Sequence, residues 1–389
     1  MVDDDIWMNL ATQSVNKLDA YIDQQADQLC KVAVRSLVRM YDPQTRTFCH
    51  CIRRGEQGDQ VEGTSVRYAA TVLIGLAEHP DSLVCEVLHG QSADDVCATL
   101  IAGLSSDSEL GEVALTLWAA RAMNHADASQ ALEALRAAKP QSCDAPTVEI
   151  AWSLSALVAD ANDNARDDDL AKLIANRLLR SFNEDTALFS HVPFDSNPSA
   201  MRAHVACFAD LVYPIQALSF YYQFANDTDA LAAATRCGQR MCDGQGEQGQ
   251  WWWHHDVRTG QCIEQYPVYS VHQDSMAPMA LLALRQASGV CHADAISRGL
   301  EWLENAPEID GSLFDKDADL IWRKVARREP GKLVRGLQAT ASKVHPSLRV
   351  PAANTIFPPT YIDYETRPYH MGWILYAWSK RFASAPQSS

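Results

Sequence analysis

The sequence is poor in basic residues and has no apolar run long enough to anchor it in a membrane. Lys and Arg number 33 against 49 Asp and Glu, so the net charge is -16 at pH 7. Such a surface repels a phosphate backbone, and the single basic run, 323–328, is followed at once by Glu329. A bilayer span needs roughly 18 consecutive apolar residues, and none occurs. We therefore expect no nucleic-acid partner and no membrane insertion.

The sequence also lacks the patterns that indicate export, disulfide bonds or metal binding. Residues 1–5 lack the basic-then-apolar pattern of a signal peptide. The 11 cysteines are scattered and mostly lie in apolar helical stretches, which favours reduced thiols and a cytoplasmic location. Cys49-His50-Cys51 is too tightly spaced for a zinc knuckle and has no second Cys/His pair nearby. We expect no metal site and no cofactor.

The sequence lacks a linker and the familiar catalytic motifs. No segment is long, Gly/Ser-rich or repetitive enough to separate two domains, so one domain over 1–389 is expected. There is no Gly-x-Ser-x-Gly elbow, phosphate loop or His-Glu-x-x-His. Function must therefore be inferred from the arrangement of side chains rather than from a motif.

Helical periodicity fills most of the chain, with almost no strand-like alternation. Each predicted helix follows the apolar pattern of 3.6 residues per turn. The predicted helices cover 12–41, 65–78, 93–104, 109–123, 127–138, 146–160, 167–182, 205–225, 227–242, 270–288, 292–305 and 368–383.

These helices alternate in character along the chain. The odd-numbered members are amphipathic, as 169–180 shows, and the even-numbered members are apolar nearly all round, as 68–77 shows. A helix that is apolar on every side must be covered on every side, whereas an amphipathic helix covers it and faces water. Six repeats of this alternation predict an all-α (α/α)6 toroid, a double ring of six helical hairpins.

The connections predict where a site lies. Links from an inner helix to the next outer helix are short, but four links from outer to inner helices are long, near 42–64, 183–204, 243–269 and 306–367. Long connections in compact domains are usually functional or disordered, and these carry aromatics. All four reach the rim where inner helices begin, so we expect a site at that end.

This pattern resembles the alpha/alpha toroid proteins, which include six-hairpin glycosidases, sugar epimerases and lyases, and triterpene-type cyclases. The resemblance covers nearly the whole chain and lies in architecture. The segment 246–253 is similar to the Gln/Trp repeats of squalene-cyclase relatives, but it occurs once. The resemblance implies a site at the N-terminal ends of the inner helices.

One polar and aromatic cluster precedes the fifth inner helix. Trp251-Trp252-Trp253 is costly to expose, and flat aromatic faces suit sugar rings and carbocations. Tyr269, His272 and Gln273 fall at the start of that helix, whose positive end favours anions. The alternative is that the tyrosines only pack between the segments of the rim and that His272 only caps the helix.

A second cluster precedes the sixth inner helix. It combines carboxylates, an arginine, tyrosines and a histidine within ten residues, a set able to act in general acid/base catalysis. The alternative is an ion-paired surface loop. Together the two clusters predict the catalytic candidates Asp363, Glu365, Tyr269, His272, Tyr369 and His370. The predicted substrate-binding residues are Trp251, Trp252, Trp253, His255, Arg67, Tyr68, Trp152, His204, Tyr213, Gln273 and Arg367.

Three functions remain open at this point. The first is a carbohydrate-active enzyme, a glycoside hydrolase or a uronate lyase or epimerase, with a small-molecule or oligosaccharide substrate. The second is an isoprenoid cyclase, although the Asp-Asp-x-x-Asp and Asp-x-Asp-Asp motifs of terpene cyclases are absent. The third is a non-catalytic scaffold. The sequence does not indicate the oligomeric state.

Overall fold

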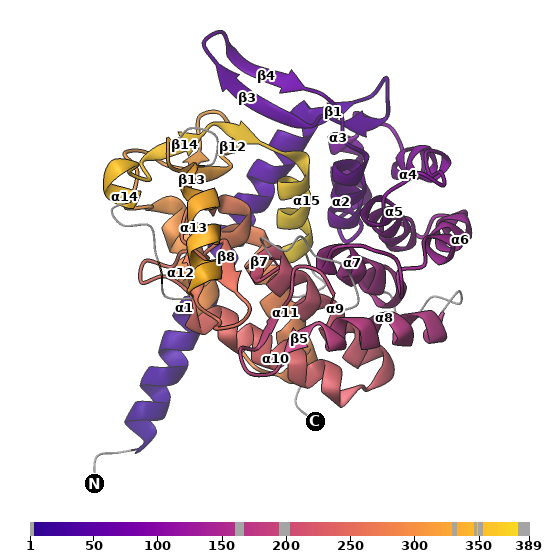
Figure 1. The fold of residues 1–389 in the computed structure, drawn as a ribbon. Coiled ribbons are helices and arrows are strands. Elements are labelled where there is room, and N and C mark those ends of the chain that lie inside the picture. The colour runs from indigo at the N-terminus through magenta and orange to yellow at the C-terminus, as the bar shows by residue number, and fades with distance from the viewer. Residues whose placement is uncertain are drawn as a thin grey trace.

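The helices form an inner and an outer layer in the computed structural model, which describes residues 4–159, 167–193, 203–328, 333–345, 348 and 353–379. Each inner helix contacts the next, and the last contacts the first, so the inner layer is a closed ring (Figure 1). The inner helices are α2 (Val66–Leu76), α5 (Leu110–Ala122), α7 (Thr147–Val158), α9 (Ala209–Ala225), α11 (Ala277–Ser288) and α15 (Pro368–Ala377).

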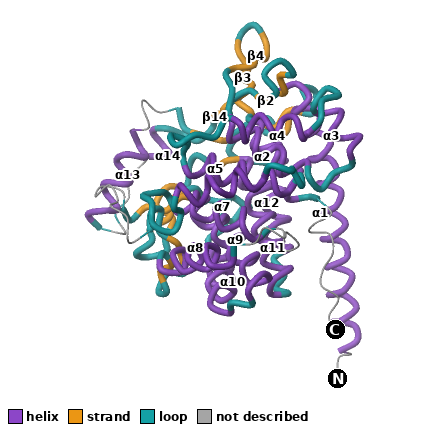
Figure 2. Tube along the Cα trace, turned by 90° about the vertical axis from the view of Figure 1, so that its right-hand side faces the viewer, coloured by secondary structure: helices purple, strands orange, loops and turns teal. Residues whose placement is uncertain are grey.

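The outer helices pack around this ring with one face in water. In α8 the buried positions include Leu170, Ile174 and Leu178, whereas α5 buries almost every residue. The outer helices are α1 (Asp4–Met40), α4 (Ala93–Ala102), α6 (Ala128–Ala138), α8 (Asp168–Arg180), α10 (Thr228–Asp243) and α12 (Ala293–Glu304). The beginning of α1 extends away from the body (Figure 2). Within the described residues, no helix is long and apolar enough to span a membrane.

The predicted (α/α)6 arrangement is confirmed, with local errors. The helix expected from residue 205 begins at Ala209, because Val205–Cys207 form strand β7. The long connection expected near 306–367 is present, but it also contains two helices that the sequence did not predict, α13 (Leu333–Val344) and α14 (Ala353–Ile356). The short helix α3 (Asp81–Val87) was also missed. The expected helix ends at 160 and 383 lie outside the described residues.

Short antiparallel strands, which the sequence did not predict, organise the rim. Three sheets each contain the strand that directly precedes an inner helix: β7 before α9, β10 before α11 and β15 before α15. They therefore hold the starts of these three helices in fixed positions. The sheets are β7 (Val205–Cys207) with β8 (His254–Asp256) and β9 (Cys262–Glu264); β10 (Val268–Tyr269) with β13 (Lys324–Ala326) and β14 (Tyr361–Asp363); and β15 (Glu365–Thr366) with β3 (Cys51–Gly55) and β4 (Gly58–Glu62).

A small hairpin recurs directly after three outer helices. Its strands are β1 (Tyr41–Asp42) with β2 (Thr47–Phe48), β5 (Phe182–Asn183) with β6 (Leu188–Phe189), and β11 (Phe314–Asp315) with β12 (Leu320–Ile321). In each hairpin the second residue is Asp or Asn, and its side-chain oxygen accepts a hydrogen bond from a backbone N–H of the turn. The sixth residue has positive φ each time: Arg46, Ala187 and Asp319. The chain thus contains an internal repeat of eight residues.

The ring closes through a backbone contact between two glycines. A Cβ placed on Gly75 of α2 would lie 2.2 Å from the carbonyl oxygen of Gly372 in α15. A Cβ on Gly372 would lie 2.8 Å from the carbonyl oxygen of Thr71. Only glycine at these positions lets the first and last inner helices approach this closely.

Replacing Gly75 by Ala should therefore destabilise the protein, although alanine favours helices. We expect the free energy of unfolding to fall by about 1–3 kcal/mol, the usual cost of overpacking. Chemical denaturation measures it. The matched control is Gly336→Ala in α13, where an added Cβ has no neighbour within 4 Å. The control should be neutral or stabilising by about 0.5–1 kcal/mol, and equal behaviour of the two variants would contradict the packing argument.

Candidate active-site cavity

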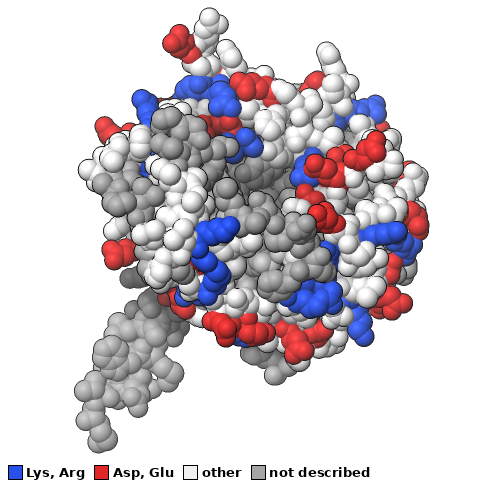
Figure 3. Space-filling view, viewed as in Figure 1, with Lys and Arg blue, Asp and Glu red and all other residues white. Residues whose placement is uncertain are grey.

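A cavity of about 410 Å³ opens at the N-terminal ends of the inner helices. Acidic and basic side chains are interspersed over the described part of this face (Figure 3). Aromatic rings and guanidinium groups make up most of the cavity lining. The residues that line it are Ser65, Arg67, Tyr68, Thr71, Leu115, Val148, Trp152, Ala209, Tyr213, Trp253, Tyr269, Val271, His272, Met276, Arg323, Arg367, Tyr369 and Trp373.

The aromatic lining residues pack against one another from different inner helices and rim strands. Tyr68 of α2 and Tyr369 of α15 have ring centroids 4.9 Å apart. Trp152 of α7 meets Tyr213 of α9 edge-on at 5.1 Å. Because each of these rings packs against a ring from another element, the lining is a rigid aromatic surface whose side chains have little freedom to repack.

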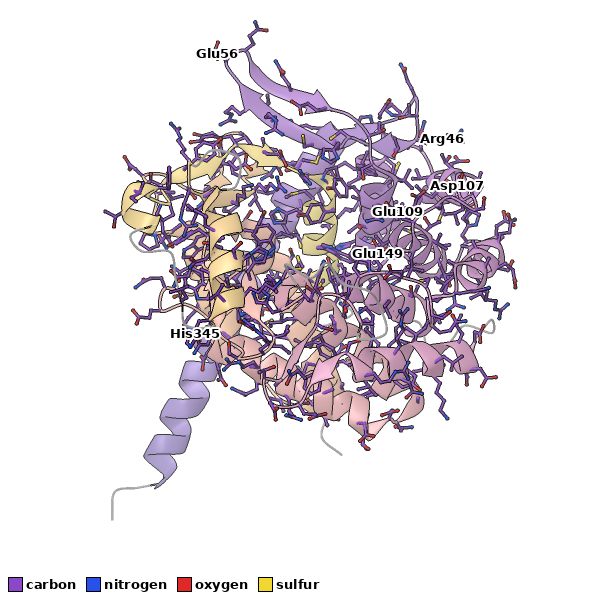
Figure 4. The ribbon with its side chains drawn as sticks, in the orientation of Figure 1. Arg46, Glu56, Asp107, Glu109, Glu149 and His345 are labelled. Carbon is purple, nitrogen blue, oxygen red and sulfur yellow. The ribbon has the colours of Figure 1, made fainter. Side chains whose placement is uncertain are left out.

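Arg67 is held at one side of the cavity by two carboxylates. Its guanidinium lies 3.1 Å from Glu149 of α7 and also binds Glu109. Figure 4 shows Glu109 and Glu149 close together at the starts of α5 and α7. Glu149 also accepts the backbone N–H of Gly111. The positive charge of Arg67 is therefore compensated.

On the opposite side a single carboxylate is shared by three arginines. Glu365, almost fully buried, binds Arg323 at 2.9 Å, Arg367 at 2.5 Å and also Arg53. Burial alone would raise the pKa of Glu365, but the charges of Arg323 and Arg367 bring that pKa below its ordinary value. Arg53 also pairs with Glu62, and Asp363, bound by Lys324, lies 3.8 Å from Arg323. Four cations therefore face three carboxylates, which leaves a small excess of positive charge on this side of the cavity in a protein with net charge -16.

Two of these arginines, Arg323 and Arg367, line the cavity. Arg367 also donates to the hydroxyl of Tyr68 at 2.7 Å, which fixes its direction. The Nε of Arg323 is buried and has no hydrogen-bond partner. An unpaired buried donor is costly, and an anionic ligand would satisfy it.

His272 is a neutral imidazole in the wall of the cavity. It lies in a π-helical turn, η1 (His272–Met276), that begins the fifth inner helix, a conformation often found at functional sites. The ring packs against Phe208 and Tyr269, with centroids 4.4 and 5.1 Å away. Its Nδ1 has no hydrogen-bond partner. Burial lowers the pKa of His272 to about 3, so the ring is uncharged at neutral pH.

A buried contact between a histidine and a carboxylate supports this helix from behind. Nε2 of His370 lies 2.8 Å from both carboxylate oxygens of Asp274, and both side chains are buried. The indole of Trp378 donates to the carbonyl oxygen of Asp274. The pair ties α15 to η1 and so fixes the relative positions of Tyr369 and His272.

The structure brings nine of the predicted site residues together in the cavity. They come from four inner helices, from η1 and from the loop and strand before it. They are Arg67, Tyr68, Trp152, Tyr213, Trp253, Tyr269, His272, Arg367 and Tyr369.

The remaining predicted catalytic residues do not line the cavity. Asp363 pairs with Lys324 at 3.0 Å within the β13–β14 sheet. Glu365 lies behind its arginines, and His370 lies behind the wall with Asp274. Their contacts are those of residues that position others.

Five predicted substrate-binding residues also lie elsewhere. Trp251 is in the core against Phe208, and Trp252 packs against Tyr266. His255 bonds the carbonyl oxygen of Trp252, His204 contacts Ser342 of α13, and Gln273 bonds the carbonyl oxygen of Tyr269. Of three consecutive tryptophans, only Trp253 reaches the cavity.

Sequence reasoning missed Arg323 and Trp373 as lining residues. Arg323 belongs to the basic run 323–328, which stands out in an acidic chain, but strand β13 had to pair with β10 and β14 to bring it to the rim. Trp373 lies inside an apolar helix, where nothing in the sequence distinguishes a cavity-lining ring from a core ring.

Comparison with known proteins identifies the fold. No family model and no curated protein sequence matches the chain. Among solved structures, the cellobiose 2-epimerase of Bacillus thermoamylovorans B4167 superposes with a TM-score of 0.65 at 9% identity, over 93% of this chain and 100% of the epimerase. A sugar epimerase from a ruminal bacterium gives 0.62 at 12% identity, over 92% and 98% of the two chains.

A third similar structure is an unsaturated glucuronyl hydrolase from Bacillus sp. GL1 that degrades glycosaminoglycan. Its TM-score is 0.59 at 13% identity, over 92% of this chain and 96% of the hydrolase. The fold is an (α/α)6 toroid. At these identities the likeness establishes the toroid fold, and the chemistry of this toroid must be argued from its own cavity.

The low pKa of His272 can be tested directly. Its imidazole should stay neutral down to about pH 4 in the folded protein, because protonation would place an unsolvated charge in the wall. In the unfolded protein the imidazole has a pKa near 6.5 and is protonated at a higher pH than in the folded protein. Protonation therefore favours the unfolded state, and the free energy of unfolding decreases as pH falls from 6.5 toward 3.

A histidine NMR titration, with His272→Gln to assign the signal, measures this pKa. A midpoint above pH 5 would contradict the burial argument.

Proposed function

We propose that this toroid is an enzyme that acts on an acidic, uronate-type carbohydrate by moving a proton, in an elimination or an epimerisation. One observation carries the proposal: the described lining residues include three arginines, four tyrosines and a neutral histidine, and no Asp or Glu. That set recognises an anion and transfers protons without a carboxylate.

The arginine side of the cavity suits the carboxylate of the sugar. Arg323 and Arg367 carry guanidinium groups whose geometry matches a carboxylate, and the cations on this side of the cavity outnumber the carboxylates by one. The aromatic walls offer flat faces on which an apolar sugar face stacks. The acidic surface outside disfavours non-specific binding of polyanions, so recognition is confined to the cavity.

The protonation states support base and acid roles. His272 is neutral with one ring nitrogen unbonded, and the negative charge of a bound uronate would raise its low pKa, so that with substrate bound it can accept the proton on the carbon next to the sugar carboxylate. Burial raises the pKa of Tyr369 to about 12, so its phenol is protonated and can donate. The electron pair released at that carbon moves onto the carboxylate, where Arg323 and Arg367 stabilise the added charge.

From this intermediate the two reactions diverge. In an elimination, the C–O bond to the neighbouring sugar breaks, and the leaving oxygen takes a proton from Tyr369. In an epimerisation, a proton returns to the same carbon from the opposite face. The similar solved structures, two epimerases and a glucuronyl hydrolase, show that the toroid hosts sugar chemistry in other proteins.

The cavity chemistry disfavours the other candidate functions. Classical glycoside hydrolysis uses two carboxylates across the scissile bond, and no described lining residue supplies one. An isoprenoid cyclase would gain from the aromatic walls, but three arginines would repel its carbocation. A scaffold would have no use for the unpaired nitrogens of Arg323 and His272.

A first test uses uronate oligosaccharides in D₂O with the full chain. Elimination produces an unsaturated uronate that absorbs in the ultraviolet, and epimerisation places deuterium next to the carboxylate. If neither signal appears with a panel of uronates while neutral glycosides are turned over, the proposal is wrong.

Loss of an arginine should affect charged sugars selectively. We expect Arg323→Gln and Arg367→Gln each to weaken the binding of a uronate oligosaccharide roughly 10- to 100-fold, the usual value of a hydrogen bond to a charged group. Binding of the matched neutral sugar should change little. Calorimetry measures both. The control is Arg236→Gln, because Arg236 pairs with Glu184 outside the cavity. Equal losses of affinity for the charged and the neutral sugar would argue against carboxylate recognition.

Loss of the base should affect turnover rather than binding. His272→Asn and Tyr369→Phe should each lower kcat by on the order of 100- to 10,000-fold, with KM nearly unchanged. The control is His345→Asn, an exposed histidine that Figure 4 places away from the inner ring. Full activity of His272→Asn would remove this residue from the mechanism.

A further inference from the structure

A second group of reactive side chains lies at the start of α9, beside the cavity. His191, Cys207 and Asp210 each offer one ligand atom, and these three atoms lie within 4.8 Å of one another. Nδ1 of His191 is 3.0 and 3.2 Å from the two oxygens of Asp210. The backbone N–H of Cys207 donates to the same carboxylate at 2.7 Å.

The carboxylate of Asp210 is fully buried, and no lysine or arginine of the described residues pairs with it. Among the described residues its partners are His191 and Cys207. A buried carboxylate is costly unless a cation compensates it. A metal ion between the three side chains would supply that charge.

We propose that His191, Cys207 and Asp210 bind a Zn²⁺ ion. A nitrogen, a thiolate and a carboxylate oxygen form a donor set that zinc accepts in tetrahedral sites. In such a site, N and O ligands about 2.0–2.1 Å from the metal are separated by roughly 3.3 Å. The observed separations between His191 and Asp210 are close to that value, so little movement is needed.

Three protein ligands leave the fourth tetrahedral position to solvent or to a ligand, as in catalytic zinc sites. His191 is about half exposed, so the site is accessible from outside. Ala209, which lies between two of the ligands in sequence, lines the cavity.

Metal analysis of the full-length chain tests this proposal without any sugar. The protein is stripped with a chelator, reloaded with Zn²⁺, dialysed and analysed by mass spectrometry, and calorimetry gives the affinity. We expect about one Zn²⁺ per chain. His191→Gln and Cys207→Ser should lower the affinity on the order of 100-fold or more. Cys291→Ser, at an exposed cysteine elsewhere, should bind like the unmodified protein.

Cobalt substitution provides a second measurement. Co²⁺ bound by Cys207 should give a thiolate charge-transfer band that is present in Cys291→Ser and absent in Cys207→Ser. Because His191 is exposed, His191→Gln should keep its fold, which circular dichroism checks. No zinc in the unmodified protein, or equal zinc in all variants, would overturn the proposal. Either result is independent of whether the cavity acts on uronates.

Discussion

The approach of α2 to α15 is the constraint on which the structure depends. Five of the six contacts in the inner ring join helices that are neighbours in sequence order, but this one joins the first inner helix to the last. It is possible because Gly75 and Gly372 meet backbone to backbone. The contact sets Tyr68, about two turns before Gly75, and Tyr369, about one turn before Gly372, with ring centroids 4.9 Å apart, and so determines the width of the cavity.

The rim adds charge to this aromatic framework. Two connections supply the cluster around Glu365: β3, in the connection 42–64, carries Arg53, and the connection 306–367 carries Arg323 directly before β13 and Glu365 in β15. The carboxylate works as a structural anchor for guanidinium groups, which is a different role from the acid/base role expected from the sequence. The pair of Asp274 and His370 is similar, since it fixes neighbours that reach the cavity.

The sequence was sufficient for the fold because the toroid is encoded in helix periodicity. Alternation of amphipathic and fully apolar helices predicted the two layers, and loop lengths predicted which end carries the site. It was not sufficient for the rim, because strands of two to five residues leave no detectable alternation. For the same reason, it could not tell Trp253 from Trp251, or place His191 beside Cys207. Such distinctions depend on pairings between distant segments.

Ring closure also has a consequence for the order in which the protein folds. Residues 75 and 372 are nearly three hundred positions apart, and the long outer helix α1 packs on both α15 and α12. Hairpins from the middle of the chain can form from local contacts as they leave the ribosome, but the first two helices stay without their final partners until the last inner helix emerges. Their apolar faces are therefore exposed for most of synthesis, which makes the N-terminal part the segment most in need of a chaperone.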